Sequence, residues 1–413
     1  MIATHVSNKL PNEHAGAKVM AGFISLFSGA GGLDLGLERA GWDCLFATDF
    51  DPLAVRTLEA NRGVSLGRGH RALADTVIEE ADVHDLTGGA ILAKLGAARG
   101  SVPLLAGGPP CQSWSSAGHQ QGFDDPRGRL VGEYLRIASE IDARWLIFEN
   151  VRGLLTARGR DGVPGSALAQ VRHSLLQRGW QTRVELLNAA DYGVPQRRVR
   201  LILIGYRAGD APTIPTATHA DHWLTLGDGL AGIAPPSGDE IIRPTGKMAA
   251  ELEHLPPGTG AKSPGKREST RPGGHWGYKQ GAFIADLAVP ARTVTANPQQ
   301  DWVRDPVLGL RRLCPRECAA IQTFPEAWRF EGKRNDQYRL IGNAVPPVLA
   351  MKLGTALAKH IGRAGSAQAA GWSELHPLPE RLQSAIQYTK REESRNGASR
   401  KIAVERGLGR LSA

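Results

Sequence analysis

The chain has 413 residues, of which 41% are hydrophobic, and its formal net charge is +9. This length allows two or three domains with a sizeable core, and no apolar run approaches the roughly 20 residues that span a bilayer. The positive charge favours a polyanionic partner, nucleic acid first, over the alternative of a merely basic soluble protein.

The chain has four cysteines, and none of them forms a CxxC pair. Because no histidine cluster stands at zinc-ligand spacing either, we expect no metal site. Cys314 and Cys318 are four residues apart in a predicted helix, which indicates packing. So few cysteines in so long a chain predict no disulfide framework, and therefore a reducing compartment, the cytoplasm.

A glycine-rich turn follows the first predicted strand. The polar residues 1–20 are expected to form a flexible lead, after which the apolar run 23–27 leads into the turn 28–32 (SGAGG) and a helical pattern over 33–40. This order of strand, glycine turn and helix start leaves backbone N–H groups for an anionic or polar ligand. On its own such a turn is a weak signal.

An acidic and an aromatic residue, Asp49 and Phe50, end the second predicted strand, residues 44–48. An acid about 20 positions past a glycine turn is placed to accept hydrogen bonds from ribose hydroxyls, and the ring beside it could cover an adenine. The alternative is a helix N-cap aspartate beside a core phenylalanine. A polar loop is expected over residues 63–71, and a weaker third strand is expected to end at Asp82 and Val83.

The stretch 107–115 (GGPPCQSWS) follows the apolar run 102–106, which predicts a buried strand. The glycines permit a sharp turn and close approach to a ligand, and the prolines fix φ and end regular structure. Cys111 is thereby placed on a stiff turn, and the polar residues 115–129 behind it are placed as a lid. The alternative is a proline-rich turn with an incidental cysteine.

Strands alternate with helices through residue 205, which predicts an α/β fold with a mostly parallel, doubly wound sheet. Ligands of such sheets sit beyond the carboxyl ends of the strands. The predicted strand 145–148 ends at Glu149, so the glycine turn, Asp49, Asp82, Cys111 and Glu149 all lie at this edge. Their convergence favours a functional role for Cys111 over the incidental one.

The composition changes after Tyr206. Residues 208–290 interleave basic and aromatic side chains on Gly- and Pro-rich loops, which is typical of a nucleic-acid surface. A solvated irregular insertion is the alternative. Helices are expected again over 311–322 and 340–360, and the residues from about 364 onward, charged in both signs, predict a solvated or disordered tail.

Six motifs over about residues 21–362, in family order, resemble those of the DNA (cytosine-5) methyltransferases. They are residues 27–32 (FSGAGG), 109–112 (PPCQ) with Ser115, 149–151 (ENV), 196–200 (QRRVR), 311–325 with IQTFP at its end, and 342–345 (GNAV).

The resemblance implies a Rossmann-like S-adenosylmethionine-dependent methyltransferase fold with a smaller irregular target-recognition domain. The implied division is a flexible N-terminal lead (1–20), a catalytic domain (21–207 plus 311–362), a target-recognition domain (208–310, core about 235–290) and a charged tail (363–413).

The resemblance also implies methyl transfer from S-adenosylmethionine to carbon 5 of a flipped-out cytosine in a short, specific double-stranded DNA sequence. Cys111 would add covalently to carbon 6 while Glu149 serves the ring nitrogen N3. Arg200 would hold the cytosine O2 oxygen, and Arg198 would steady the acid and the nearby backbone. The alternative for Glu149 is a helix-capping acid. The alternative for Arg198 and Arg200 is a pair of phosphate-contacting arginines.

Two sets of binding residues follow from these motifs. The cofactor set is Phe27, Ser28, Gly29, Gly31, Gly32, Asp49, Phe50, Asp82, Val83, Pro110, Asn343 and Val345. The DNA set is Ser115, Gln120, Arg127, Lys262, Arg271 and Lys279.

We therefore expect a monomeric, cytoplasmic bacterial modification enzyme that uses no metal and contacts no membrane. A cognate restriction endonuclease acting on the same site is a further expectation. An RNA cytosine-5 methyltransferase and an inactive DNA-binding regulator are the alternatives. The large basic insertion disfavours the first, and the presence of both Cys111 and Glu149 disfavours the second.

Overall fold

The computed structural model describes residues 22–67, 70–110, 126–207, 209, 211–262, 281–361 and 372–392. Seven strands form the central sheet, in the order β5 (Val77–Glu80), β2 (Asp43–Asp49), β1 (Gly22–Leu26), β6 (Leu104–Gly107), β7 (Trp145–Val151), β9 (Val199–Tyr206) and β8 (Gln181–Asn188). Neighbours from β5 to β7 run parallel, and β9 is antiparallel to both of its neighbours. The predicted α/β fold with a mostly parallel sheet is confirmed.

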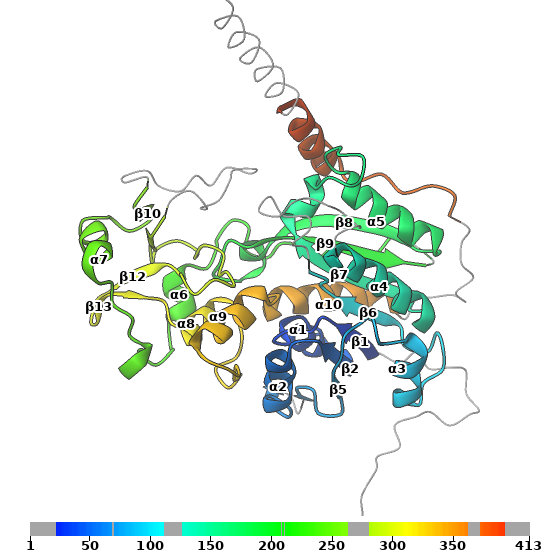
Figure 1. Cartoon of the computed structure of the whole chain (residues 1–413), viewed down its shortest axis with the longest axis horizontal. Coiled ribbons are helices and arrows are strands. Elements are labelled where there is room, and N and C mark those ends of the chain that lie inside the picture. Colours follow the sequence, from blue (N-terminus) through cyan, green and yellow to red (C-terminus); the bar gives the residue numbers. More distant parts are fainter. Residues whose placement is uncertain are drawn as a thin grey trace, which may run out of the picture.

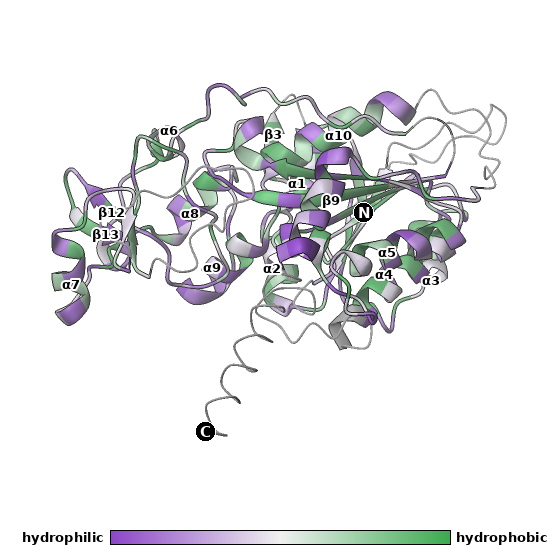
Figure 2. Cartoon of the chain, turned by 90° about the horizontal axis from the view of Figure 1, so that it is seen from above, coloured by the Kyte–Doolittle hydropathy of each residue, from purple (hydrophilic) through white to green (hydrophobic). Residues whose placement is uncertain are grey.

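Helices cover both faces of this sheet (Figure 1). One hydrophobic cluster holds residues of α1 (Gly32–Arg39), α2 (Pro52–Ala60) and α10 (Pro347–Ile361). The other holds residues of α3 (Gly88–Leu95), α4 (Pro126–Ile141) and α5 (Ser166–Gln177). Strands covered on both faces are mostly apolar, and β1 is buried along its whole length with Ser25 as its one polar side chain. Figure 2 shows the central strands coloured as hydrophobic between helices of mixed colour.

α1 and α10, which lie more than 300 residues apart in the sequence, pack with almost no space between them. A Cβ atom at Gly36 would lie 2.3 Å from the Ala350 Cβ and 2.4 Å from the Pro347 carbonyl oxygen. The Trp42 indole N–H donates to the Gly354 carbonyl at 3.0 Å. Small residues on both helices therefore let the backbones approach closely.

A second, smaller region forms the other end of the molecule in Figure 1. It contains α6 (Leu226–Leu230), α7 (Gly246–Glu253) and the four-stranded sheet β10 (Thr259–Gly260), β11 (Phe283–Ile284), β12 (Trp302–Asp305) and β13 (Gly309–Arg312). Its core is small: Leu252, Leu255, Ile284 and Trp302. α8 (Pro315–Ile321) and α9 (Arg334–Asn343) lie between it and the central sheet.

Three predicted elements differ in detail from the structure. Residues 63–71, predicted as a loop, include the hairpin β3 (Ser65–Gly67) and β4 (His70–Arg71). The helix predicted from residue 311 begins only at Pro315, because β13 pairs with β12 up to Arg312. The helix predicted over 340–360 is divided into α9 and α10, since proline can begin a helix but cannot continue one.

The remaining differences are smaller. β5 ends at Glu80, two residues before Asp82, and α3 was not predicted. Three short 3₁₀ helices complete the described elements: η2 (Arg152–Thr156), η3 (Ala189–Tyr192) and η4 (Gly238–Glu240).

The prediction of a solvated or disordered tail is wrong for residues 372–392. Residues 380–392 are helical, and the Leu382 side chain is only 1% exposed within the cluster of α4 and α5. Arg381 pairs with Glu185 of β8, and the backbone N–H of His376 donates to the Gln181 side chain at 3.1 Å. Charges of both signs obscured an apolar stripe at four-residue spacing: Leu378, Leu382 and Ile386.

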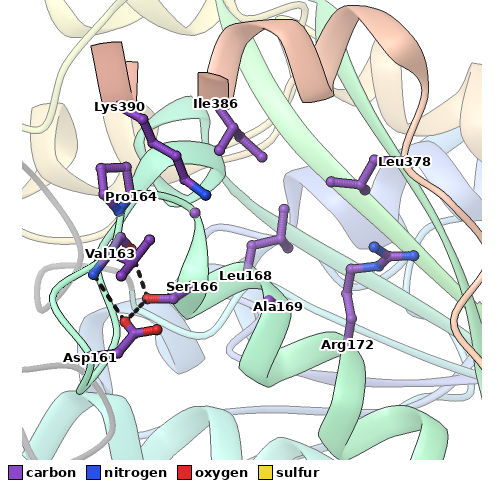
Figure 3. Close-up of a pocket in the computed structure, with 11 residues that line it drawn as sticks. Asp161, Val163, Pro164, Ser166, Leu168, Ala169, Arg172, Leu378, Ile386 and Lys390 are labelled. Atoms are coloured by element: carbon purple, nitrogen blue, oxygen red, sulfur yellow. Dashed lines mark hydrogen bonds between the residues drawn. The ribbon is translucent and has the colours of Figure 1, made fainter. Parts of the chain in front are cut away.

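This docked helix, red in Figure 1, borders a cavity of about 320 Å³ against α5. Figure 3 shows Leu378 and Ile386 on one side of the cavity, and Leu168 and Arg172 on the other. Arg172 also donates to the backbone carbonyl of His376. The C-terminal segment is therefore part of the folded domain.

One helical stretch in the described part of the chain, Arg334–His360, is long and apolar enough by length and composition to cross a membrane. However, 72% of its most apolar window is buried inside the protein. The stretch comprises α9 and α10, and its burial is that of core helices.

Candidate active site

β1 and β6 end at the same level on one edge of the central sheet, beside Phe148 of β7. Leu26 of β1 lies opposite Gly107 of β6, and Gly107 lies opposite Phe148 of β7. Neighbouring strands are about 4.8 Å apart, so the segments that follow these residues begin side by side. Those segments are the glycine turn, the turn that leads to Cys111, and Glu149.

The glycine turn, here called the cofactor turn (residues 28–32), is held by β2. The Gly29 N–H donates to the Asp49 carboxylate at 2.8 Å, and the Ser28 N–H donates to the Thr48 carbonyl at 3.0 Å. Gly29 and Gly31 have φ of 54° and 77°, a left-handed conformation that favours glycine. Burial raises the pKa of Asp49 above its ordinary value.

The alternative roles of Asp49 and Phe50 are wrong. The N-cap of α2 is Asp51, whose side chain accepts from the Leu53 N–H. Phe50 is 69% exposed and therefore not a core residue. It directly follows Asp49, and its exposed ring is available to cover an adenine.

The residues after β5 are less closely joined to the turn. The Asp82 carboxylate is half-exposed and interacts with His84 Nδ1 at 2.7 Å. Val83 is buried, and its carbonyl accepts from Arg136. Both residues lie past the carboxyl end of β5, on the predicted edge of the sheet.

The segment after α9 closes over the cofactor turn from the other side. A Cβ atom at Gly32 would lie 2.2 Å from the Val345 carbonyl oxygen. Trp328, a residue that no sequence pattern marked, donates from its indole N–H to the Ala30 carbonyl at 3.1 Å. Asn343 is exposed at the end of α9. The turn is thus enclosed by residues about 300 positions away.

These residues fit S-adenosylmethionine by their chemistry. The cofactor joins an adenosine to a cationic methionine, which calls for an aromatic face, acidic acceptors and bare backbone. Phe50 supplies the aromatic face, Asp49 supplies the acidic acceptor, and the cofactor turn supplies the bare backbone. A side chain at Gly32 would fill the space where the turn meets residue 345.

Glu149 is almost fully buried and paired with Arg200. Arg200 Nε donates to Glu149 Oε1 at 3.0 Å, and the two side chains are 13% and 11% exposed. Burial raises the pKa of Glu149, while the positive charges of Arg200 and Arg198 partly offset that effect. A helix-capping role for Glu149 is wrong, because the residue lies within β7.

The glycines after β6 serve close contact with the protein itself. A Cβ atom at Gly107 would lie 2.6 Å from the Leu26 carbonyl oxygen, and one at Gly108 would lie 2.9 Å from Glu149 Oε2. The Asn150 side chain donates to the Pro109 carbonyl at 3.1 Å. The backbone is therefore fixed against β7 up to Pro110; Cys111 follows in the sequence and lies outside the described residues.

Arg198 is 1% exposed and joins three segments. It donates to the Val294 carbonyl at 2.9 Å, the Gly342 carbonyl at 2.8 Å and the Ala344 carbonyl at 2.9 Å. A phosphate-contacting role is incompatible with this burial.

Two buried glutamines, missed as site residues although both lie in the family motifs, reinforce the same junction. The Gln196 side chain accepts from the Val294 N–H at 2.7 Å and donates to the Gln322 side chain at 2.8 Å. Gln322 in turn donates to the Ile341 carbonyl at 2.7 Å.

Most of the predicted DNA-contacting residues lie outside the described residues: Ser115, Gln120, Arg271 and Lys279. Arg127 lies at the start of α4. Lys262 is described and exposed, beside Gly281 in the smaller region. The DNA set therefore stays a prediction.

A family model described as C-5 cytosine-specific DNA methylase matches residues 21–359. The Type II methyltransferase M1.HphI of Haemophilus parahaemolyticus is 31% identical over 345 residues, covering 82% of this chain and 86% of the relative. The Type II methyltransferase M.NgoPII of Neisseria gonorrhoeae is 31% identical over 392 residues, covering 87% of this chain and all of the relative.

Solved structures agree with this chain in fold. The S. pombe Dnmt2 methyltransferase superposes with a TM-score of 0.57 at 16% identity, covering 82% of this chain and 98% of that one. The Entamoeba histolytica methyltransferase EhMeth superposes with a TM-score of 0.59 at 15% identity, covering 82% and 98%.

Proposed function

This chain belongs to the C-5 cytosine-specific DNA methylases, DNA cytosine-5 methyltransferases of the restriction-modification type, and on that premise we propose how its site works. We propose that it methylates carbon 5 of one flipped-out cytosine in a short double-stranded DNA sequence, with S-adenosylmethionine as methyl donor. The observation that carries this proposal is the register of the sheet, which sets Leu26 and Gly107, the last residues of β1 and β6, level with Phe148 of β7, the residue before Glu149.

The order of the three strands supports a site in which the cofactor and the target base lie on opposite sides of the turn toward Cys111. β6 lies between β1 and β7, so the turn toward Cys111 has the cofactor turn on one side and Glu149 on the other. A base presented there meets a nucleophile, an acid and a methyl donor from three neighbouring strands. A base stacked in a duplex cannot reach them, so it must be flipped out.

Cys111 acts as the nucleophile. Carbon 5 of cytosine is a poor nucleophile, and addition of a thiolate to carbon 6 makes it an enamine carbon that can accept a methyl group. After transfer, loss of the carbon-5 proton and departure of the thiolate restore the aromatic ring. S-adenosylmethionine, when bound, supplies the electrophilic methyl group.

Glu149 assists the addition at the ring nitrogen N3. Burial raises its pKa, which favours its taking up a proton that it shares with N3 as negative charge develops on the ring. Arg200, already bonded to Glu149 at 3.0 Å, fixes the carboxyl orientation and presents the rest of its guanidinium to the O2 oxygen.

Arg198 fixes the position of Glu149 and Arg200 relative to the cofactor turn. Its bonds to the carbonyls of Val294, Gly342 and Ala344 join the β9 start to the segment that encloses the cofactor turn. We assign it a positioning role.

The smaller region, within residues 208–310, is proposed to select the target sequence, with the cytosine entering between it and the central sheet. We propose that the enzyme acts as a cytoplasmic monomer that protects a site also cut by a cognate restriction endonuclease.

Bisulfite sequencing of a plasmid from a methylation-free host expressing this chain tests the function. Protected cytosines in one short recurring context are expected. A fully converted plasmid, with soluble protein that binds S-adenosylmethionine, would instead favour an RNA substrate or an inactive regulator.

Cys111→Ala is the matched control in that host. It should abolish methylation while leaving cofactor and DNA binding intact. Continued methylation by this variant would contradict the proposed covalent mechanism.

A further inference from the structure

A carboxyl group is buried directly behind the cofactor turn. Asp34, in the first turn of α1, has no exposed surface. The Ser25 hydroxyl donates to Asp34 Oδ1, and the Ser28 hydroxyl donates to Ser25 Oγ at 2.9 Å. Ser28 is the first residue of the cofactor turn, so a chain of two hydroxyls joins the turn to the carboxyl group.

The second carboxyl oxygen has no such support. Asp34 Oδ2 is buried and has no hydrogen-bond partner among the described residues. A buried carboxylate is costly unless its oxygens are hydrogen-bonded or a cation lies near. The arrangement is therefore better suited to a neutral carboxyl group than to an ion.

Among the described residues, the charged neighbour that affects the pKa of Asp34 is another acid and not a cation. Asp49 of β2 acts on the pKa of Asp34, and Asp34 acts in turn on Glu38 of α1 and Cys44 of β2. α10 meets α1 with small residues, such as Ala350 against Gly36. Burial raises the pKa of Asp34 to about 7, and the two serine hydroxyls act in the opposite direction.

A cation on the other side of the turn changes this balance. S-adenosylmethionine carries a sulfonium and an ammonium group, and a positive charge near a carboxyl group favours its ionised form. The hydroxyl chain gives the proton a route outward, because each serine can accept a proton from one neighbour and pass one to the next.

We propose that Asp34 is a positioning residue of the cofactor turn and releases its proton to solvent, through Ser25 and Ser28, when S-adenosylmethionine binds. The inference rests on the proposed function of this site. The proton passes from the Asp34 carboxyl group to buffer, each serine hydroxyl ends with the one proton it began with, and no bond of the cofactor changes. Cofactor affinity then rises with pH through the neutral range.

Isothermal titration calorimetry of S-adenosylmethionine binding at pH 7 tests this, in two buffers of different ionisation enthalpy. The wild-type protein should release roughly half a proton per site, since the pKa lies near this pH. Asp34→Asn, which keeps the shape but cannot ionise, should release none and lose the rise of affinity with pH. Equal proton release by both proteins would overturn the proposal.

Glu38→Gln is the matched control. Glu38 is a second buried acid on the same helix, but both of its oxygens accept from the Leu73 N–H and not from the turn. This variant should keep the wild-type proton release. The proposal would be contradicted if Glu38→Gln lost the proton release and Asp34→Asn kept it. The released proton would then come from Glu38.

An infrared difference spectrum of the wild-type protein gives a second readout that needs no variant. Adding S-adenosylmethionine should remove a protonated-carboxyl stretch band and create a carboxylate band. Binding without that change overturns this inference alone. Failure to bind S-adenosylmethionine at all contradicts the proposed function itself.

Discussion

Arg200 and Glu149 form a nearly buried ion pair, with Arg200 Nε 3.0 Å from Glu149 Oε1, across the two antiparallel strands β9 and β7. In that register Arg200 lies opposite Val151, and its side chain reaches back toward the end of β6. Since Gly108 leaves no room for a Cβ beside Glu149 Oε2, the pair stands against the turn that leads to Cys111. The acid, Glu149, is therefore held in contact with the turn that leads to the nucleophile, Cys111.

Glu149→Gln should lower the rate of DNA methylation by about 100-fold or more, because a general acid contributes on the order of 10²–10⁴. Binding of S-adenosylmethionine should be unchanged. Single-turnover methylation with tritiated cofactor measures the rate. Glu185→Gln is the control, since Glu185 is also buried and arginine-paired but lies on β8; an equal loss in both variants would argue against a specific role.

Gly342→Ala should destabilise the protein by about 3 kcal/mol, because an added Cβ would lie 2.1 Å from the Thr295 carbonyl carbon in a packed core. It should also disturb the Gly342 carbonyl that accepts from Arg198. Urea denaturation measures the change. Gly132→Ala, in α4 with open space around it, should instead stabilise by about 1 kcal/mol.

The free energy of unfolding should fall as the pH rises from about 5 to 8. Burial raises the pKa of Asp34 to about 7 and that of Glu38 to about 8. The folded state then binds more protons than the unfolded state, so each group favours folding at low pH and loses that contribution as it ionises, by at most about 1.4 kcal/mol per pH unit. Urea titrations at several pH values measure the slope, and Glu38→Gln should reduce it; an unchanged slope would contradict the prediction.

Leu382→Ala should destabilise the protein by about 2–4 kcal/mol, because Leu382 is 1% exposed in the cluster of α4 and α5. Thermal denaturation measures the effect. Removal of residues 372–413 should be at least as damaging, because it removes Leu382 together with Leu378 and Ile386. If the protein without residues 372–413 melted at the same temperature as the full-length protein, the segment would add no stability.

The sequence predicted the positions of residues that depend on local order. Strand, glycine turn and helix recur together because the turn must follow a buried strand, so the order of residues alone places Gly29, Asp49 and Glu149 on one edge of the sheet. The motifs placed Val345 near the cofactor turn only through the family resemblance, since no local pattern joins it to Gly32.

What the sequence could not predict depends on contacts between distant segments. Trp328 has no spacing that marks it as a partner of Ala30, and Asp34 reads as an ordinary acid in the first turn of a helix. The C-terminal helix was missed because charged residues dominate its composition, while its stability comes from three apolar side chains that meet α4 and α5.

The close packing of α1 on α10 has a consequence for synthesis. Gly36 meets Ala350 and Pro347, so the first helix of the chain waits for a partner made more than 300 residues later. At ~5–20 residues per second on the ribosome, the interval is roughly 15–60 s. During that time the face of α1 that packs on α10 has no native cover, so the nascent chain exposes this face until α10 has been made.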